Sequence, residues 1–165
     1  MEYAVLFLPL FGAIFGYLTK YFGDIFAQLT TTFFVCVTAV LSIILFYNGI
    51  FHGTYGNYII YQWIASGNFI VNWSVNIDPL SSIMLVVVSV ISALVHIYSI
   101  GYMKHDPNKP RFMAYLSLFT FSMLALVVSD NFLQLFFGWE GVGLCSYLLI
   151  GFWYKKETAN NAAIK

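Results

Sequence analysis

The chain has 165 residues, of which 61% are hydrophobic, 20% aromatic and 8% charged, and its formal net charge is zero. Average soluble domains carry about 25% charged residues, so this composition excludes a domain with a water-soluble surface and places the chain in a lipid bilayer. A net charge of zero leaves no basic surface for nucleic acid, and no nucleic-acid partner is expected.

The N-terminal unit, residues 1–50, contains two apolar runs at 3–19 and 30–50. Each can span a hydrocarbon core as a helix of about 20 residues, although the first is short. A signal peptide would begin with basic residues, whereas this chain has Glu2, so the first run predicts a retained membrane helix. The lack of an Arg-rich presequence favours a bacterial protein or one made inside an organelle.

Residues 51–78 have a different pattern. The segments YIIYQWI (58–64) and FIVNWSVNI (69–77) flank Ser66-Gly67-Asn68, and apolar and polar residues alternate in the second segment. Alternation with a period of two around a glycine turn predicts a β-hairpin. Because open strand edges cannot lie in lipid, we expect this hairpin outside the hydrocarbon, docked on another protein surface.

The rest of the chain holds three more apolar runs and a polar tail. The runs are residues 79–103, 112–129 and 131–153. They form a second membrane unit at 79–154, and residues 155–165 form a tail on the inner side that leads towards a sixth helix. The predicted fold class is all-α integral membrane, with about five transmembrane helices and one extramembrane β-hairpin.

Two aspartates precede predicted helices on the outer side. Asp78 is a good N-cap and is followed by Pro79, a residue favoured in the first turn. Asp130 is explained in the same way, as a helix cap.

The connection 129–131 is so short that the helices it joins must be antiparallel neighbours.

All seven Lys and Arg residues fall on one side of a membrane that five helices cross. They are Lys20, Lys104, Lys109, Arg111, Lys155, Lys156 and Lys165. Inner-side loops carry an excess of Lys and Arg, so this side is predicted to face inward. The N-terminus and the hairpin then face outward, and the C-terminus faces inward.

Glu140 is the only charged residue in the run FFGWEGVGLCSYLLIGFW (136–153). It comes about ten residues into its span, about 15 Å deep in a core about 30 Å thick. A charge there costs about 3 kcal/mol on insertion scales, and a carboxyl group that gains and loses a proton would suit a proton relay. The competing interpretation is a neutral, hydrogen-bonded Glu140 that only joins helices.

The glycines around Glu140 keep part of this helix thin, so a neighbouring helix or a file of water can approach closely. Plain helix packing explains Gly138, Gly141 and Gly143 at least as well as a water channel does. The glycine-thinned face is the expected contact surface for a second chain. A buried carboxylate without a basic partner in its own chain is expected to find a lysine there.

His96 is the other ionisable residue in a predicted span, towards its inner end. A histidine there could pass protons, and it could equally be a neutral hydrogen-bonding residue; the second interpretation is favoured. Cys36 and Cys145 lie in long apolar runs, which is not the spacing of a metal or iron–sulfur site. Both are expected to be packing residues, and no metal is expected.

Four segments resemble, in order along the chain, the antiporter-like subunit family of respiratory complex I, called chain 5 in mitochondria and subunit L in bacteria. They are DPLSSIMLVVVSVISALVHIYSIGYM at 78–103, NKPRFMAYLSLFTFSMLAL at 108–126, SDNFLQLFFGWEGVGLCSYLLIGFWY at 129–154 and ANNAAIK at 159–165. The third segment distinguishes this family from its paralogues and from multi-subunit cation/proton antiporters.

The resemblance implies a non-redox subunit of NADH:ubiquinone reductase, in a membrane arm that pumps protons while NADH is oxidised elsewhere in the complex. It implies that Glu140 pairs with a lysine on the family's seventh helix. The family pattern continues beyond Lys165, so we expect a split or truncated subunit in which a second chain supplies the missing helices and the buried lysine. The other membrane-arm subunits are expected partners.

The same resemblance implies that NAD, FMN, iron–sulfur clusters and ubiquinone are bound by other subunits, with no cofactor in this chain. The expected location is the mitochondrial inner membrane or, alternatively, a bacterial plasma membrane. Two other functions are compatible with the residues. One is a subunit of a multi-subunit cation/proton antiporter without a redox partner, and the other is a purely structural assembly piece in which Glu140 is inert.

Overall fold

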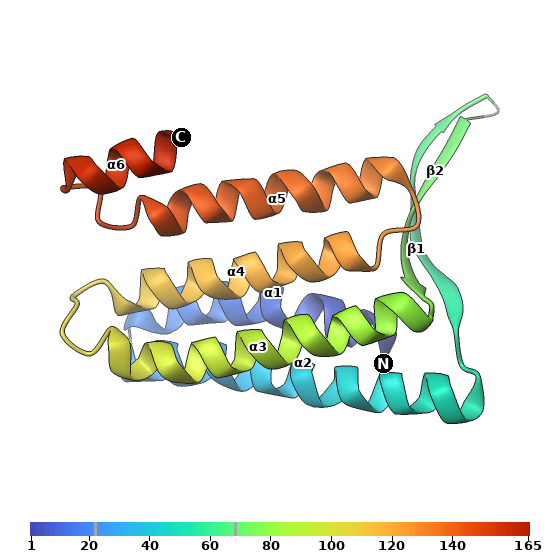
Figure 1. Ribbon diagram of the computed structural model, residues 1–165, viewed down its shortest axis with the longest axis horizontal. Helices are drawn as coiled ribbons and strands as arrows, with labels where there is room; N and C mark the ends of the chain where they lie inside the picture. The colour runs from blue at the N-terminus through green and yellow to red at the C-terminus, as the bar shows by residue number, and fades with distance from the viewer. Residues whose placement is uncertain (22, 68) are drawn as a thin grey trace.

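Apolar helices that run back and forth along one axis make up the body of the chain (Figure 1). The structure is a computed structural model and describes residues 1–21, 23–67 and 69–165. The long helices are α1 (Glu2–Leu18), α2 (Asp24–His52), α3 (Pro79–Tyr102), α4 (Lys109–Val127) and α5 (Phe132–Ile150). A 3₁₀ turn, η1 (Thr19–Tyr21), joins α1 to α2, and a short helix, α6 (Glu157–Ile164), follows α5.

Four of the described helices, α2 to α5, are long and apolar enough to cross a membrane, and α1 is a shorter apolar helix beside them. Helix α1 packs on α2 and α4, and α2 packs on α3, so α1 to α4 form one bundle. Helix α5 packs on α4 at the edge of this bundle (Figure 1). These features confirm the predicted all-α membrane class and the antiparallel pairing of the last two long helices.

The helices of the bundle approach closely where side chains are small. The space beside Gly16 of α1 is filled by the side chain of Thr31 of α2, so a larger residue at position 16 would not fit. At the end near the hairpin, a buried apolar core joins Val5 and Leu6 of α1 to Leu85 of α3 and Leu124 of α4. Close packing of side chains and backbones holds the bundle together, because lipid supplies no hydrophobic driving force between helices.

The predicted hairpin is confirmed as an antiparallel pair of strands, β1 (Gly56–Ser66) and β2 (Phe69–Ile77). Ser66 pairs with Phe69, and Gly67 between them has a φ of 57°, a left-handed conformation that favours glycine. Asn68, the last residue of the predicted turn, lies outside the described residues. Two register shifts in β1 interrupt the regular alternation of the strands.

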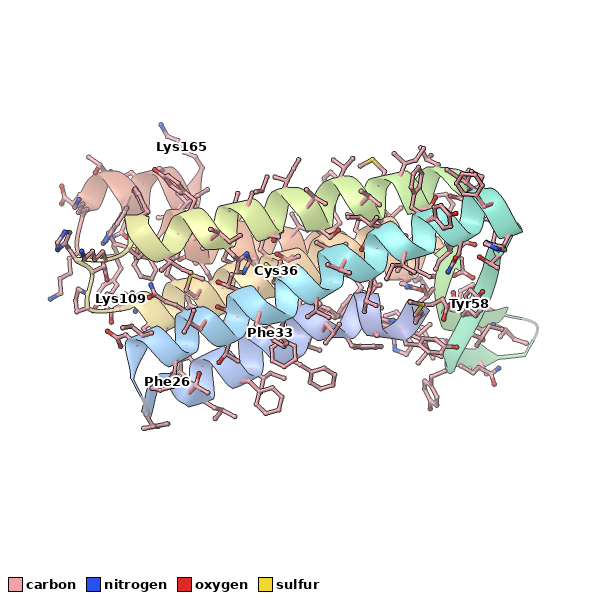
Figure 2. The ribbon with its side chains drawn as sticks, turned by 90° about the horizontal axis from the view of Figure 1, so that it is seen from below. Phe26, Phe33, Cys36, Tyr58, Lys109 and Lys165 are labelled. Atoms are coloured by element: carbon pink, nitrogen blue, oxygen red, sulfur yellow. The ribbon has the colours of Figure 1, made fainter. Side chains whose placement is uncertain are left out.

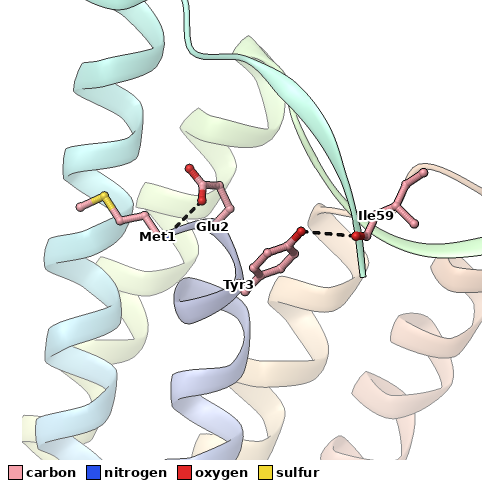
Figure 3. A network of polar contacts seen from close by, with 4 residues as sticks. All are labelled: Met1, Glu2, Tyr3 and Ile59. Atoms are coloured by element: carbon pink, nitrogen blue, oxygen red, sulfur yellow. Dashed lines mark hydrogen bonds and ion pairs between the residues drawn. The ribbon is translucent and has the colours of Figure 1, made fainter. Parts of the chain in front are cut away.

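The base of the hairpin docks on this chain's own helices, although the sequence led us to expect another protein surface. The Tyr3 hydroxyl of α1 donates a hydrogen bond to the Ile59 carbonyl of β1 at 3.3 Å (Figure 3). The Asn76 amide of β2 donates to the Val128 carbonyl after α4 at 2.9 Å. The hairpin lies at one end of the bundle, as Tyr58 shows, and Lys109 and Lys165 lie at the other (Figure 2).

The two aspartates that were expected to cap helices have different roles. Asp78 caps α3 as predicted: its carboxylate accepts a hydrogen bond from the Ser81 amide at 2.6 Å, and its own amide donates to the Ser81 hydroxyl at 2.8 Å. The same prediction for Asp130 is wrong, because Asn131 is the cap of α5. Asp130 instead accepts hydrogen bonds from the side chains of Asn57 and Asn131, both at 2.6 Å.

The surroundings of Asp130 favour its ionised form. Partial burial acts to raise the pKa of this carboxyl, but hydrogen bonds from neighbouring side chains, Asn57 and Asn131 among them, outweigh burial and hold the pKa below its usual range. Asp130 therefore stays charged at neutral pH and links the hairpin to the turn between α4 and α5.

Candidate functional site

Glu140 lies near the middle of α5, on a face that no other part of the described chain covers. Its side chain is exposed, and within the described residues it takes part in no hydrogen bond or ion pair. With a rise of 1.5 Å per residue, it is about 12 Å from the start of α5 and about 15 Å from its end. A carboxyl group is therefore held near the middle of a helix that is long and apolar enough to cross a membrane, on the outside of this chain.

Two of the three glycines around Glu140, Gly138 and Gly141, point towards α4, which corrects the expectation that they would contact a second chain, whereas Gly143 does not face α4. A Cβ atom added at Gly138 would lie 2.7 Å from the backbone of Leu126 in α4, and one added at Gly141 would lie 2.8 Å from the Ser122 hydroxyl. The Cys145 sulfur is 3.9 Å from the same hydroxyl. Plain helix packing within the chain therefore explains these small residues.

The opposite face of α5 carries Glu140 among large exposed side chains. Phe136 is 59% exposed, Trp139 66% and Leu144 58%, and an added Cβ at Gly143 would meet nothing within 4 Å. We call these five residues, 136, 139, 140, 143 and 144, the open face of α5. It combines an apolar surface with one carboxyl group.

The N-terminal end of α5 is anchored to the hairpin through a buried glutamine. The Gln134 side chain accepts a hydrogen bond from the Ser74 amide at 3.1 Å and donates one to the Ser74 carbonyl at 2.7 Å, and both residues are 0% exposed. The Asn131 side chain accepts from the Gln134 amide at 2.9 Å and donates to the Asn72 carbonyl at 2.9 Å. These bonds fix the rotation of α5 and so the direction of Glu140.

The described basic residues are far from Glu140 along the axis of the bundle. Lys109 and Arg111 lie in the first turn of α4; Lys109 pairs with Asp24 at 3.4 Å, and Arg111 donates to the Phe152 carbonyl at 3.1 Å. The other described basic residues lie between helices or at the C-terminus, and the side chain of Lys20 is not described. No described cation can therefore pair with a carboxylate in the middle of α5.

His96 lies inside the bundle and is 0% exposed. Its Nδ1 is 2.8 Å from the Ser92 carbonyl, one turn earlier in α3, and the Ser92 hydroxyl bonds the Thr120 hydroxyl of α4. Among the described residues its Nε2 has no hydrogen-bond partner. The structure therefore does not bring the two candidate residues together: His96 is enclosed by this chain, whereas Glu140 faces out of it.

Comparisons with known proteins identify the family. A family model described as NADH-Ubiquinone oxidoreductase (complex I), chain 5 N-terminus matches residues 63–113. A second, described as NADH:quinone oxidoreductase/Mrp antiporter, TM, matches residues 129–165. His96 lies in the first matched segment and Glu140 in the second.

Curated relatives match nearly the whole chain. NADH-quinone oxidoreductase subunit L of Rickettsia felis is 51% identical over 162 residues, which is 98% of this chain and 25% of the relative. NADH-ubiquinone oxidoreductase chain 5 of Phytophthora infestans is 52% identical over 98% of this chain and 24% of the relative, and that of Arabidopsis thaliana is 49% identical over 100% and 25%. The chain thus spans about a quarter of the length of these relatives, and it belongs to the family of complex I chain 5 and subunit L.

Proposed function

We propose that this chain is part of the membrane arm of a proton-pumping NADH:quinone oxidoreductase and that Glu140 relays protons at mid-membrane. The observation that carries the proposal is the carboxyl group on the open face of α5, which has no partner among the described residues. A charged carboxylate in contact with lipid would cost about 3 kcal/mol or more. Polar or charged groups outside residues 1–165 must therefore meet it, or it must bind a proton.

A lysine from outside residues 1–165 is the proposed partner. The family resemblance points to a lysine on a later helix, and a buried carboxylate in a membrane is stabilised by pairing with a cation. The lysine would come from the rest of a longer polypeptide or from a second chain, together with the helices that cover the open face. Proton exchange between such a pair would depend on redox chemistry in other subunits, where NAD, FMN, iron–sulfur clusters and ubiquinone are bound.

The proposed location is the mitochondrial inner membrane or a bacterial plasma membrane, with the hairpin on the outer side. The described Lys and Arg residues support this orientation. They lie between α3 and α4, at the start of α4 or after α5, at the end of the bundle where Lys109 and Lys165 are seen away from the hairpin (Figure 2). A cysteine in place of exposed Ser66 should react with a membrane-impermeant thiol reagent added outside, and one in place of exposed Asn108 only with reagent added inside. Labelling of both positions from the same side would contradict this topology.

Substitution of Glu140 tests the proton relay. Glu140→Gln keeps the size of the side chain and much of its hydrogen bonding but cannot carry the proton, whereas Glu140→Asp keeps the acid. In assembled complexes, NADH-driven proton uptake should fall by about tenfold or more in Glu140→Gln and less in Glu140→Asp. The matched control is Glu157→Gln, which removes an exposed carboxylate at the start of α6 and should leave proton uptake unchanged.

The order of the two variants separates the proposal from its alternatives. If Glu140 only joins helices, Gln is the closer isostere and should be tolerated better than Asp. Full proton uptake in Glu140→Gln at matched assembly levels would therefore contradict the relay. Purification of the chain with cation/proton antiporter subunits, and without flavin or iron–sulfur subunits, would instead favour the antiporter function.

A further inference from the structure

The threonines of α2 reveal a polar site inside the bundle that the proton relay of Glu140 does not use. Thr30, Thr31 and Thr38 each donate a hydrogen bond to a carbonyl of their own helix, at distances between 2.7 and 3.0 Å. Thr32 is buried, with 8% of its surface exposed, but among the described residues its hydroxyl has no partner. Its hydroxyl is therefore available for a group outside its own helix.

Five further buried side-chain polar atoms lack partners in the described part of the chain, and two of the five belong to α2 and α3. These two are Nε2 of Gln28, a residue that is 4% exposed, and Nε2 of His96, which is 0% exposed. Buried polar groups in proteins are almost always hydrogen-bonded, to protein or to ordered water. A single bound molecule could provide the missing hydrogen bonds of all three atoms, if the three residues lie close together.

Helix geometry places the three residues at the interface between α2 and α3. Thr31 and Phe34 of α2 contact glycines of α1, while Val35 and Ala39 form a buried cluster with Ala93 of α3. At 100° per residue, Gln28 and Thr32 share the stripe of Val35 and Ala39 and so face α3.

The same cluster also fixes where the three residues lie along the axis of the bundle. The chain runs along α2 and α3 in opposite directions, so one turn from Val35 back to Thr32 and one turn from Ala93 on to His96 both lead towards the inner end (Figure 1). Each step is about 4.5 Å. Thr32 and His96 therefore lie at similar depth, with Gln28 one further turn inward.

The hydrogen-bonding groups of these residues complement one water molecule. The Ser92 carbonyl can only accept a hydrogen bond, so Nδ1 of His96 carries the ring proton and Nε2 of the neutral ring is an acceptor. A water can donate to this Nε2, accept from the Gln28 amide and share a hydrogen bond with the Thr32 hydroxyl. Buried waters typically make about three hydrogen bonds.

We infer that Gln28, Thr32 and His96 form a binding site for an ordered water between α2 and α3. The imidazole connects this water to the Ser92 carbonyl, and the Ser92 hydroxyl continues to Thr120 of α4. The site is a hydrated polar layer across three helices, enclosed by this chain and separate from the open face of α5. It does not depend on the identity of the group that meets Glu140.

A density map of the assembled complex, at a resolution that shows ordered waters, tests the site directly. The expected result is a solvent peak about 3 Å from His96 Nε2 and from the side chain of Thr32 or Gln28. A direct hydrogen bond between Gln28 and His96 that leaves no space for a solvent peak would overturn the inference. A dry gap at Nε2, lined by apolar groups, would overturn it as well.

A matched pair of threonine substitutions provides the second test. Thr32→Val removes the unpartnered hydroxyl, and Thr38→Val removes a buried hydroxyl that bonds the Phe34 carbonyl at 2.9 Å. The solvent peak should weaken or disappear in Thr32→Val and remain in Thr38→Val, and heat-inactivation temperatures should not rise in either. If the site is dry, Thr32→Val removes an unsatisfied polar group and should raise the inactivation temperature, which would contradict the inference.

Discussion

His96 and Glu140 are both ionisable side chains within long apolar helices, but the structure places them in opposite surroundings. His96 is 0% exposed and hydrogen-bonded to its own helix within the bundle, whereas Glu140 is exposed on the open face of α5. An apolar sequence shows that a residue lies in the membrane, but not whether its own chain encloses it. The difference assigns His96 to the interior of this chain and Glu140 to a surface that the rest of the described chain leaves uncovered.

The helices that carry these surfaces differ in the same way. Nine residues of α4 are buried, and only three of α5 are: Gln134, Gly138 and Cys145. All three lie on the stripe that faces α4 or the hairpin. One face of α5 thus packs on α4 and the hairpin, and the opposite face is exposed.

The largest expected effect on this arrangement comes from the anchor of α5. Gln134→Leu keeps the approximate volume but leaves the amide and carbonyl of Ser74 buried without partners, which should cost about 3 kcal/mol of the free energy of unfolding. It should also lower proton uptake, because the rotation of α5 directs Glu140. Thermal unfolding and proton uptake of the assembled complex measure the two effects.

The control for this substitution is Gln62→Leu, on an exposed position of β1 in the same hairpin, which should change neither quantity. If Gln62→Leu changed the unfolding temperature and proton uptake as much as Gln134→Leu does, the effect of Gln134→Leu would not be specific to its position. In that case, the bonds between Gln134 and Ser74 would not anchor α5.

A smaller effect should distinguish the two faces of α5 directly. Gly138→Ala places a Cβ atom 2.7 Å from the backbone of Leu126, and such overpacking costs about 1–3 kcal/mol. Gly143→Ala adds the same atom on the open face, where nothing of this chain lies within 4 Å. The midpoint temperature of thermal unfolding, measured on the isolated chain in detergent, should therefore fall in Gly138→Ala and stay unchanged in Gly143→Ala. A larger loss for Gly143→Ala would reverse the assignment of the faces.

Much of the fold could be predicted because it depends on local patterns. The alternation in 69–77 predicted β2, and the pair Asp78 and Pro79 predicted the start of α3. The predicted run 30–50 starts later than α2, which begins at Asp24. The polar residues Asp24 and Gln28 interrupt the apolar pattern at the start of α2, but they do not interrupt the helix.

The orientation of the glycine face could also have been predicted from spacing. Gln134, Gly138, Gly141 and Cys145 follow intervals of four, three and four residues, which form one stripe of a helix. Glu140 is two residues from Gly138, about 200° around the helix, so it points away from that stripe. The small size of Gly138 and Gly141 shows that a helix can approach them closely, whereas their spacing shows that this helix lies on the side away from Glu140.

Other features of the site have no local signal in the sequence. Gln134 and Ser74 are 60 residues apart, and the alternation of β2 shows only that Ser74 is on the polar side of the strand. Ser74 is buried against α5. Asp130 likewise matches a helix cap in sequence, but the hairpin brings Asn57 to it and Asn131 takes the capping position. Only tertiary packing determines these contacts.

The position of Glu140 in the assembled complex tests the central claim most directly. A structure of the complete membrane assembly should show the open face of α5 covered by polypeptide from outside residues 1–165. We predict a lysine amine within salt-bridge distance of the Glu140 carboxyl group, about 4 Å, or linked to it by water. A Glu140 side chain that faces lipid, or that meets only helices α1 to α6, would contradict the account.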